Sequence, residues 1–281
     1  MTPFALATIE SHGRPIPCLE RDGRFYRLPE DLMALLAKGV PLDKLAAGEE
    51  VKAERVLTPL QYPGKVLCAG ANYYDHIKEM GVPDVRKEAQ RLFFFFKPPR
   101  NSLVGPGRTV RYPQDSKMFD WEVELAAVIG RTARRLTMAN ALEHVAAYSI
   151  GIDLSARDLN RAPETFYKLD WVAGKAQDTC CPLGPRLVPA QFIRDPQDLA
   201  LKLSVNGQVK QDARTSGMIF DIREQLVTLS AIMTLDPGDI VLTGTPAGVG
   251  MPKQTFLKPG DRVDAEIESI GKLSVEIGEA A

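Results

Sequence analysis

The chain has 281 residues, which is enough for one large domain or for one domain with a small appendage. Hydrophobic residues make up 44% of it and charged residues 25%, as is typical of globular proteins, and the formal net charge is -1. This balance gives no electrostatic reason to expect a nucleic acid or a membrane surface as a partner, so an anionic ligand must be held by local charge.

The cysteines and the N-terminal residues predict a cytoplasmic location. Residues 1–10 lack the basic start and apolar run of a secretory signal, and no apolar stretch approaches the ~20 residues of a transmembrane helix. The cysteines contain no C-x-x-C pair, and the adjacent Cys180 and Cys181 are poor disulfide partners. We therefore expect reduced thiols.

The first sixty residues predict a small α+β module. Residues 4–28 follow a strand, turn, strand pattern, with Asp22-Gly23 as the hairpin turn. Residues 30–38 place leucines at helical spacing before a glycine stop, and residues 51–60 favour a further strand. Tyr62-Pro63-Gly64 then interrupts the pattern. We place the boundary there, between a module of residues 1–62 and a main domain of residues 63–281.

The main domain is predicted to be rich in strands. Short β-type runs are separated by turn signals, and they cover residues 66–69, 92–96, 122–129, 146–152, 201–205 and 239–242. Helical patterns cover residues 75–80, 138–144 and 222–229. Since a regular βαβ alternation is missing, we expect a mixed, β-rich α+β fold. The four phenylalanines at residues 93–96 are predicted to be mostly core packing.

Residues 120–125 alternate three acids with three apolar side chains, and the acids are Asp120, Glu122 and Glu124. In a strand, the period of two puts all three acids on one face. The solvated face of an edge strand commonly explains such a pattern. Residues 126–129 are apolar on both faces, however, which favours a buried strand. Neighbouring carboxylates in a buried strand repel each other unless a cation neutralises them.

A second apolar run, residues 146–152, ends in Asp153. Alone, Asp153 would be explained as a turn or helix-cap residue. With Glu122 and Glu124 it completes an all-oxygen ligand set, which suits Mg2+ or Mn2+, with Ca2+ as a third option, and does not suit Zn2+. A calcium-binding structural module is the competing hypothesis. Three carboxylates leave about three octahedral positions for water or substrate, which favours catalysis.

Two further segments offer polar groups. His76 and Glu79 lie three residues apart, so a helix would place them on one face, either as a general base with its partner carboxylate or as an ordinary surface pair. Lys175 follows a glycine and is either an exposed loop lysine or a cation that neutralises an enolate or carboxylate. Residues 239–250 predict a strand entering a glycine-rich turn, whose free N–H groups could hold a carboxylate.

Together these segments resemble the fumarylacetoacetate hydrolase family, over roughly residues 65–277. The resemblance rests on the order and combination of six motifs: Asn72-Tyr73-x-Asp75-His76, Phe95-x-Lys97-Pro98, Trp121-Glu122-Val123-Glu124-Leu125, Asp153-x-Ser155-Ala156-Arg157-Asp158, Gly174-Lys175 with Asp178-Thr179, and Leu242-Thr243-Gly244-Thr245-Pro246-x-Gly248-Val249-Gly250. Residues 1–62 resemble the small N-terminal extension of the family's bacterial members.

The resemblance implies a β-rich mixed roll or sandwich, a divalent metal and a homodimer. By motif match it also implies site residues in three roles. The metal ligands are Glu122, Glu124 and Asp153; the catalytic residues are His76 and Glu79 on a mobile lid, with Lys175; the substrate contacts are Arg157, Asn160 and Thr245. Asn160 stands where related members often carry Gln.

We therefore predict a divalent-metal-dependent hydrolase that cleaves a C–C bond in an acylpyruvate-like 1,3-diketo acid. An oxaloacetate-type decarboxylase and a 2-hydroxymuconate-type isomerase are the alternatives on the same site, because these reactions pass through the same or a closely related enolate. The expected ligand is a small 2-oxo acid. The expected partner is a second copy of the chain, with no nucleic acid and no membrane.

Overall fold

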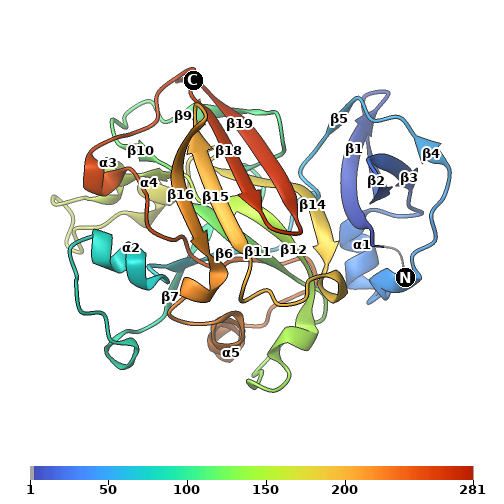
Figure 1. Ribbon diagram of the computed structural model, residues 1–281, viewed down its shortest axis with the longest axis horizontal. Coiled ribbons are helices and arrows are strands. Elements are labelled where there is room, and N and C mark those ends of the chain that lie inside the picture. The colour runs from blue at the N-terminus through green and yellow to red at the C-terminus, as the bar shows by residue number, and fades with distance from the viewer. Residues whose placement is uncertain (1–2, 281) are drawn as a thin grey trace.

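Strands dominate the computed structural model, which describes residues 3–280 (Figure 1). Within these residues the strands form a 12-stranded sheet, a 5-stranded sheet and a 2-stranded pair. Only a few short helices accompany them, as the β-rich α+β prediction requires, and that prediction is confirmed. Residues 1, 2 and 281 of the predicted module and main domain lie outside the described range.

The large sheet runs from the N-terminal strands to an edge strand that lines the cavity described below. In order it contains β4 (Glu50–Val51), β3 (Arg24–Arg27), β2 (Arg14–Arg21), β1 (Ala5–Ser11), β14 (Cys181–Pro189), β12 (Val145–Ile152), β11 (Val123–Ile129), β17 (Ile240–Leu242), β6 (Val66–Gly70) and β7 (Phe93–Lys97). In addition β5 (Arg55–Val56) pairs with β1, and β8 (Leu103–Val104) pairs with β14. The pairings are antiparallel except β17 with β6 and β8 with β14.

The small sheet contains β16 (Gln208–Arg214), β15 (Ala200–Val205), β18 (Arg262–Ile267), β19 (Gly271–Ala280) and β9 (Thr109–Tyr112). The 2-stranded pair is β10 (Phe119–Asp120) with β13 (Ser155–Ala156). All six predicted runs of the main domain correspond to strands, with end positions shifted by one residue at most. Prediction missed β14 and most of the small sheet.

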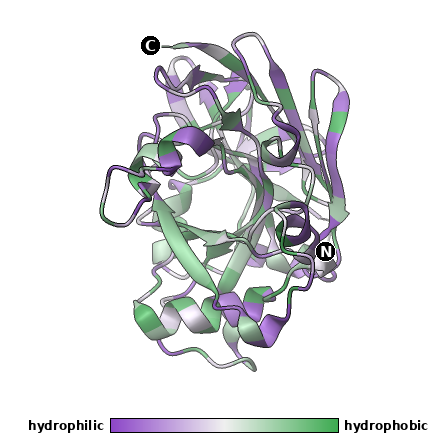
Figure 2. Cartoon of the chain, turned by 90° about the vertical axis from the view of Figure 1, so that its left-hand side faces the viewer, coloured by the Kyte–Doolittle hydropathy of each residue, from purple (hydrophilic) through white to green (hydrophobic). Residues whose placement is uncertain are grey.

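Strand β11 is buried on both faces, and each face packs into a different hydrophobic core. Its odd-numbered residues, such as Leu125 and Ala127, pack in the core beneath the small sheet. Its even-numbered residues Ala126 and Val128 belong to a second core, together with the leucines of the N-terminal helix. This explains why the side chains of residues 126–129 are apolar on both faces of the strand. Apolar residues are concentrated on the interior strands, and polar residues on outer loops and hairpin ends (Figure 2).

The N-terminal residues form one end of the molecule (Figure 1). Two hairpins connect β1, β2 and β3, so residues 4–28 contain three strands rather than the predicted two. The missed turn is His12-Gly13, where both residues adopt positive φ. Helix α1 (Leu32–Ala37) begins at Asp31, whose side chain accepts the Ala34 N–H. Because β1 pairs with β14, these strands continue the large sheet, and the boundary at residue 62 stays a prediction.

The remaining helices are α2 (Tyr74–Glu79), α3 (Arg157–Asn160), α4 (Trp171–Lys175) and α5 (Ile222–Ile232), the last with an Asp221/Glu224 capping box. Short 3-10 turns are η1 (Leu42–Lys44), η2 (Lys87–Ala89), η3 (Ala141–His144), η4 (Ala190–Phe192), η5 (Thr215–Gly217) and η6 (Met251–Lys253). The helix predicted at residues 138–144 is thus reduced to η3. Among residues 3–280, no helix has the length and apolar character that crossing a membrane requires.

The phenylalanine run in β7 is not mostly core. Phe95 is only 8% exposed, whereas Phe93 is 40% and Phe96 is 54% exposed. The core-packing prediction is therefore wrong for Phe93 and Phe96, because β7 is the edge strand of the large sheet, where Phe93 lines a cavity and Phe96 faces solvent.

Candidate active site

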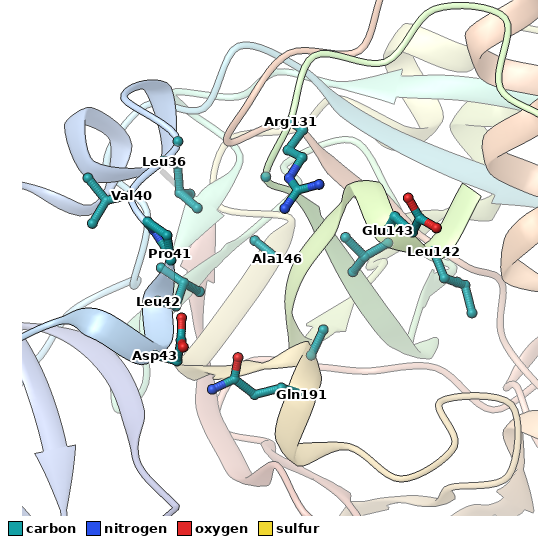
Figure 3. Close-up of a pocket in the computed structure, with 14 residues that line it drawn as sticks. Leu36, Val40, Pro41, Leu42, Asp43, Arg131, Leu142, Glu143, Ala146 and Gln191 are labelled. Atoms are coloured by element: carbon teal, nitrogen blue, oxygen red, sulfur yellow. The ribbon is translucent and has the colours of Figure 1, made fainter. Parts of the chain in front are cut away.

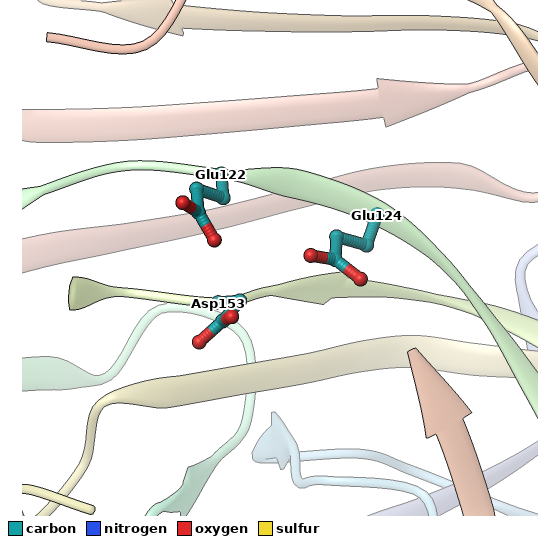
Figure 4. Close-up of side chains that lie close together, drawn as sticks. All are labelled: Glu122, Glu124 and Asp153. Carbon is teal, nitrogen blue, oxygen red and sulfur yellow. The ribbon is translucent and has the colours of Figure 1, made fainter. Parts of the chain in front are cut away.

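Three carboxylates meet where β11 and β12 lie side by side. Glu124 lies in β11, Glu122 directly precedes that strand, and Asp153 directly follows β12. The pairing of Val123 with Ile152 brings the two segments together, and the Asp153 N–H donates to the Glu122 carbonyl oxygen at 2.8 Å. One oxygen from each carboxylate lies within 4.8 Å of the others, and the side chains point toward a common centre (Figure 4). All three residues are buried.

Three cations surround this acidic centre. Lys175 Nζ lies 2.9 Å from a Glu122 oxygen and 2.6 Å from an Asp153 oxygen. Lys97 Nζ lies 2.8 Å from the other Asp153 oxygen, and Arg157 donates to Glu122. Lys175 is therefore a buried cation at the site, and its interpretation as an exposed loop lysine is wrong.

The three cations compensate the negative charges of the three carboxylates unequally. Burial acts to raise the pKa of Glu122, but Arg157 and Lys175 outweigh it and hold that pKa well below its usual range. For Glu124, burial and the charges of Asp153 and Glu122 raise the pKa well above its usual range. Its carboxylate accepts a hydrogen bond from the Gly244 N–H, a neutral donor, at 2.6 Å. A buried carboxylate with so little compensation, in an all-oxygen set, fits a divalent cation such as Mg2+ or Mn2+.

His76 and Glu79 lie on one face of α2, as predicted. His76 Nδ1 is 2.9 Å from one Glu79 oxygen, and the other oxygen accepts the Gly248 N–H at 2.9 Å. The His76 and Glu79 side chains are only 8% and 18% exposed, so the explanation as a surface pair is wrong. Because an ionised carboxylate only accepts hydrogen bonds, the neutral His76 ring carries its hydrogen on Nδ1 and its free lone pair on Nε2.

A cavity of about 360 Å³ opens over the carboxylates. Seven of the nine predicted site residues line it, and they are His76, Glu122, Glu124, Asp153, Arg157, Lys175 and Thr245. Glu79 does not line the cavity, but it forms a hydrogen bond with His76, which does. Asn160 does not line it: this residue ends α3, and its Cβ is 2.5 Å from where a Cβ on Gly174 would lie. The structure therefore does not bring Asn160 to the candidate site.

The Thr245 hydroxyl lies at the cavity but is engaged by the protein. It donates to the Val123 carbonyl oxygen at 3.0 Å and accepts from Gln211 Nε2 at 2.8 Å. Gln211 also accepts the Val123 N–H at 2.9 Å. Gln211 thus connects β11 to the glycine-rich turn, a role that the sequence pattern gave no reason to expect.

The glycine-rich turn holds carboxylates of the protein itself. Its Gly244, Gly248 and Gly250 N–H groups donate to Glu124, Glu79 and Asp120, respectively. Gly244 has a φ of +100°, and a Cβ there would lie 2.7 Å from the Cβ of Asn72. The N–H groups predicted to be free for a ligand carboxylate are therefore already occupied at these three positions.

Asp120 and Lys97 depart from the sequence-based expectations. Asp120 lies in β10, which pairs with β13 outside the large sheet, so it does not share a strand face with Glu122 and Glu124. Its carboxylate instead binds Arg157 and the Gly250 and Met251 N–H groups. Lys97 is completely buried and donates to three carbonyl oxygens as well as pairing with Asp153. The strand alternation Phe93, Phe95, Lys97 was the available signal for its inward position.

A separate groove of about 290 Å³ lies between the N-terminal helix region and the main domain (Figure 3). Leu36, Val40 and Leu42 form one side, and Arg131, Leu142 and Glu143 form the other. None of the predicted site residues lines this groove, so it is distinct from the acidic centre.

The chain matches the family model described as "Fumarylacetoacetate (FAA) hydrolase C-terminal" over residues 65–277. The chain belongs to the fumarylacetoacetate hydrolase family. Among its relatives in this family, the human mitochondrial protein named oxaloacetate tautomerase FAHD2B is 43% identical over 220 residues, which cover 77% of this chain and 67% of that protein.

Solved structures of the fumarylacetoacetate hydrolase family share the fold. A fumarylacetoacetate hydrolase from Exiguobacterium antarcticum has a TM-score of 0.83 and 35% identity, covering 98% of this chain and 99% of that one. A 2-hydroxyhepta-2,4-diene-1,7-dioate isomerase from Mycobacterium marinum has a TM-score of 0.79 and 32% identity, covering 98% of each chain. A fumarylpyruvate hydrolase from Pseudomonas aeruginosa, solved with Mn2+ and pyruvate, has a TM-score of 0.70 and 32% identity, covering 81% and 93%. The resemblance inferred from the motifs is confirmed, within a family that includes hydrolases, isomerases and tautomerases.

Proposed function

We propose that this chain is a divalent-metal-dependent hydrolase that cleaves a C–C bond in an acylpyruvate-type 2-oxo acid. The observation that carries the proposal is that His76, held by Glu79, lines the same cavity as the three buried carboxylates. A base with a fixed tautomer therefore faces the place where the electrophilic end of a substrate would bind.

We assign Glu122, Glu124 and Asp153 as the ligands of Mg2+ or Mn2+, with Ca2+ as a third option. The raised pKa of Glu124, caused by burial and by the neighbouring acids, supports a cation at this position. The bound cation supplies a Lewis acid for the 2-oxo acid end of the substrate. The Pseudomonas aeruginosa fumarylpyruvate hydrolase, with its Mn2+ and pyruvate, supports the same pairing of metal and 2-oxo acid.

The chain's own side chains supply the proton transfers and the balancing charge. His76 Nε2 removes a proton from water as the water oxygen attacks C4, the carbonyl carbon distal to the 2-oxo acid. The C3–C4 bond then breaks, its electron pair is delocalised onto the C2 oxygen as an enolate, and the proton held by His76 is delivered to C3. The products are a carboxylic acid and pyruvate. Glu79 holds the hydrogen on Nδ1, so that only Nε2 exchanges protons.

Lys175 and Arg157 supply positive charge near the developing enolate. Burial acts to lower the pKa of Lys175, but Asp153 and Glu122 outweigh it and raise that pKa, so the side chain stays protonated. A preorganised cation stabilises charge that develops only in the transition state. Thr245, with its hydroxyl engaged, contributes contact at the cavity wall, and we assign no substrate contact to Asn160.

Keto–enol tautomerisation of oxaloacetate is the second candidate. It is favoured by the 43% identity with the human protein named oxaloacetate tautomerase. His76 would then move the proton between C3 and solvent, with no C–C bond broken. Decarboxylation of oxaloacetate and isomerisation of a 2-hydroxymuconate-type dienol use the same enolate chemistry, and the Mycobacterium marinum isomerase is a relative with such a name.

A substrate panel tests the proposal. The purified protein, with Mg2+ or Mn2+, is assayed with acetylpyruvate, with oxaloacetate for both tautomerisation and pyruvate release, and with a hydroxymuconate-type dienol. We expect acetylpyruvate cleavage that EDTA abolishes and Mn2+ restores, and that His76→Ala removes. Turnover of oxaloacetate without any cleavage of acylpyruvates would refute the hydrolase proposal.

A further inference from the structure

The cavity has an aromatic wall that no step of the proposed chemistry uses. Phe93, Phe95 and Lys97 alternate along β7, so the period of two places them on one face of the strand. Their exposed fractions fall from 40% through 8% to 0%. This face therefore runs from the open side of the cavity to the buried centre, where Lys97 pairs with Asp153.

Helix α4 lies against this face of β7. Like β7, it carries an aromatic residue toward the open side of the cavity and a lysine at the buried centre. Trp171 and Lys175 are four residues apart and so share one side of the helix. The Trp171 ring stacks on Phe95 with centroids 5.2 Å apart, and it lies 5.6 Å from the Phe93 ring. Lys175 Nζ lies 4.9 Å from the Phe95 ring centroid. Phe95 thus separates the cationic end of the cavity from an end formed by Phe93 and Trp171.

The position of the Phe93 ring depends on a glycine in the neighbouring strand β6. Gly70 pairs with Phe93, and a Cβ on Gly70 would lie 2.0 Å from the nearest atom of the Phe93 ring. The ring therefore occupies the space that a side chain at residue 70 would need. Because Gly70 does not have a positive φ, close approach of the ring is the reason for a glycine at this position.

The cavity wall that faces Phe93 and Trp171 is apolar as well. Ile77 of α2 and Met80, which directly follows this helix, line the cavity, with Gln90 as an uncharged polar neighbour. The Arg and Lys side chains that line it, among the residues that the structure describes, are Arg157 and Lys175, and both pair with Glu122 at the acidic end. The aromatic end therefore offers a carboxylate no cationic partner.

We propose that Phe93, Phe95 and Trp171 form a tail subsite that selects 2-oxo acids whose far end is uncharged and apolar or aromatic. The inference rests on the proposed function, because the 2-oxo acid head must bind at the acidic centre. An aryl tail gains apolar burial and ring contacts here. A tail carboxylate would lose hydration without a hydrogen-bonded partner, next to the negative faces of aromatic rings. The subsite thus rejects substrates with a second carboxylate.

Binding of two inert ligands tests the subsite without depending on turnover. N-phenyloxamate and N-oxalylglycine share an oxamate head but carry a phenyl and a carboxymethyl tail. Calorimetric titration in the presence of Mn2+ should give at least ~10-fold tighter binding of N-phenyloxamate, the ratio that corresponds to about 1.4 kcal/mol. Phe93→Ala and Trp171→Ala should each weaken N-phenyloxamate ~3- to 10-fold and leave N-oxalylglycine within about twofold.

Three further variants sharpen the test. Phe96→Ala is the matched control, since Phe96 lies on the opposite face of β7, is 54% exposed and does not line the cavity, and it should change neither affinity. Gly70→Ala should displace the Phe93 ring and act like Phe93→Ala. Phe93→Arg adds a cation for a tail carboxylate and should shift the preference toward N-oxalylglycine, a gain that misfolding cannot produce.

The outcomes separate the subsite from the proposed function. If oxalate, N-phenyloxamate and N-oxalylglycine all fail to bind with Mn2+ present, the 2-oxo acid site is refuted together with the subsite that depends on it. If oxalate binds but N-oxalylglycine binds as tightly as N-phenyloxamate, only the tail subsite is refuted. Equal losses for both ligands in Phe93→Ala and Trp171→Ala would also overturn it.

Discussion

Replacing Glu79 with glutamine isolates the role of its carboxylate in holding His76. The two Glu79 oxygens accept from His76 Nδ1 and from the Gly248 N–H, each at 2.9 Å. A glutamine side chain has the same shape but only one acceptor oxygen, and its NH2 group donates. Either His76 or Gly248 must therefore face a donor in Glu79→Gln, and the charge that orients the imidazole is lost.

The size of the effect follows from the hydrogen bond that is lost. A hydrogen bond to a charged group contributes about 1.5–3 kcal/mol, and each 1.36 kcal/mol in the barrier changes a rate tenfold. We expect kcat for acetylpyruvate cleavage to fall by about 10- to 150-fold. Glu79 lies outside the group of three acids, so the Kd for Mn2+ should change by less than about twofold.

Steady-state kinetics at saturating Mn2+, together with calorimetric titration of Mn2+, measure both quantities. Glu88→Gln is the control, because it makes the same change at an exposed position of the same segment. The double variant with His76→Ala should be no slower than His76→Ala alone, since Glu79 acts through His76. A kcat within about twofold of the parent would refute this reasoning, and a parallel loss of Mn2+ affinity would mean that Glu79 supports the metal centre instead.

Three other predictions concern the metal, the lid and the thiols. Glu122→Ala, Glu124→Ala and Asp153→Ala should each weaken Mn2+ binding, measured by calorimetry, by more than the ~10- to 100-fold that loss of an outer-shell partner costs; parental affinity in all three would refute the site. Amide hydrogen exchange of residues 74–91 should slow when oxalate binds, because this largely polar segment has few core contacts, and equal, strong protection in both states would refute a mobile lid. Burial, opposed by Arg27, raises the pKa of Cys18 to about 11, so this thiol should resist Ellman's reagent at neutral pH in the folded protein and react after unfolding.

Local patterns in the sequence were sufficient to predict the acidic centre. The alternation of Glu122 and Glu124 within a strand that is apolar on both faces already implies two buried carboxylates on one face. Asp153 follows a second apolar run, and antiparallel pairing of adjacent strands is common enough to bring the two runs together. The spacing of His76 and Glu79 likewise needs only one helical turn. In each case the geometry is set by residues close together in the chain.

Contacts between distant parts of the chain could not be predicted in this way. The alternation along β7 indicates that Lys97 points inward, but no local pattern shows that the carbonyl oxygens of Leu154, Lys175 and Cys180 converge on its ammonium. Asp120 leaves the alternation because it lies in β10, which pairs with β13 outside the large sheet. The N–H groups of the glycine-rich turn looked free only because their partners, among them Glu79 and Glu124, lie more than a hundred residues earlier.

The charges that these distant contacts assemble connect the metal centre with the tail subsite. Four buried carboxylates, including Asp120, face the three cations Lys97, Lys175 and Arg157, so acidic groups outnumber the cations among these buried residues. A divalent cation at the three acids offsets this excess and favours the carboxylate of a 2-oxo acid head at the same place. A second carboxylate on the substrate would lie at the aromatic end, where, among residues 3–280, no Arg or Lys side chain lines the cavity to compensate it. The charge balance at the head of the cavity and the aromatic wall at its far end therefore favour the same substrates, monocarboxylic 2-oxo acids with an uncharged tail.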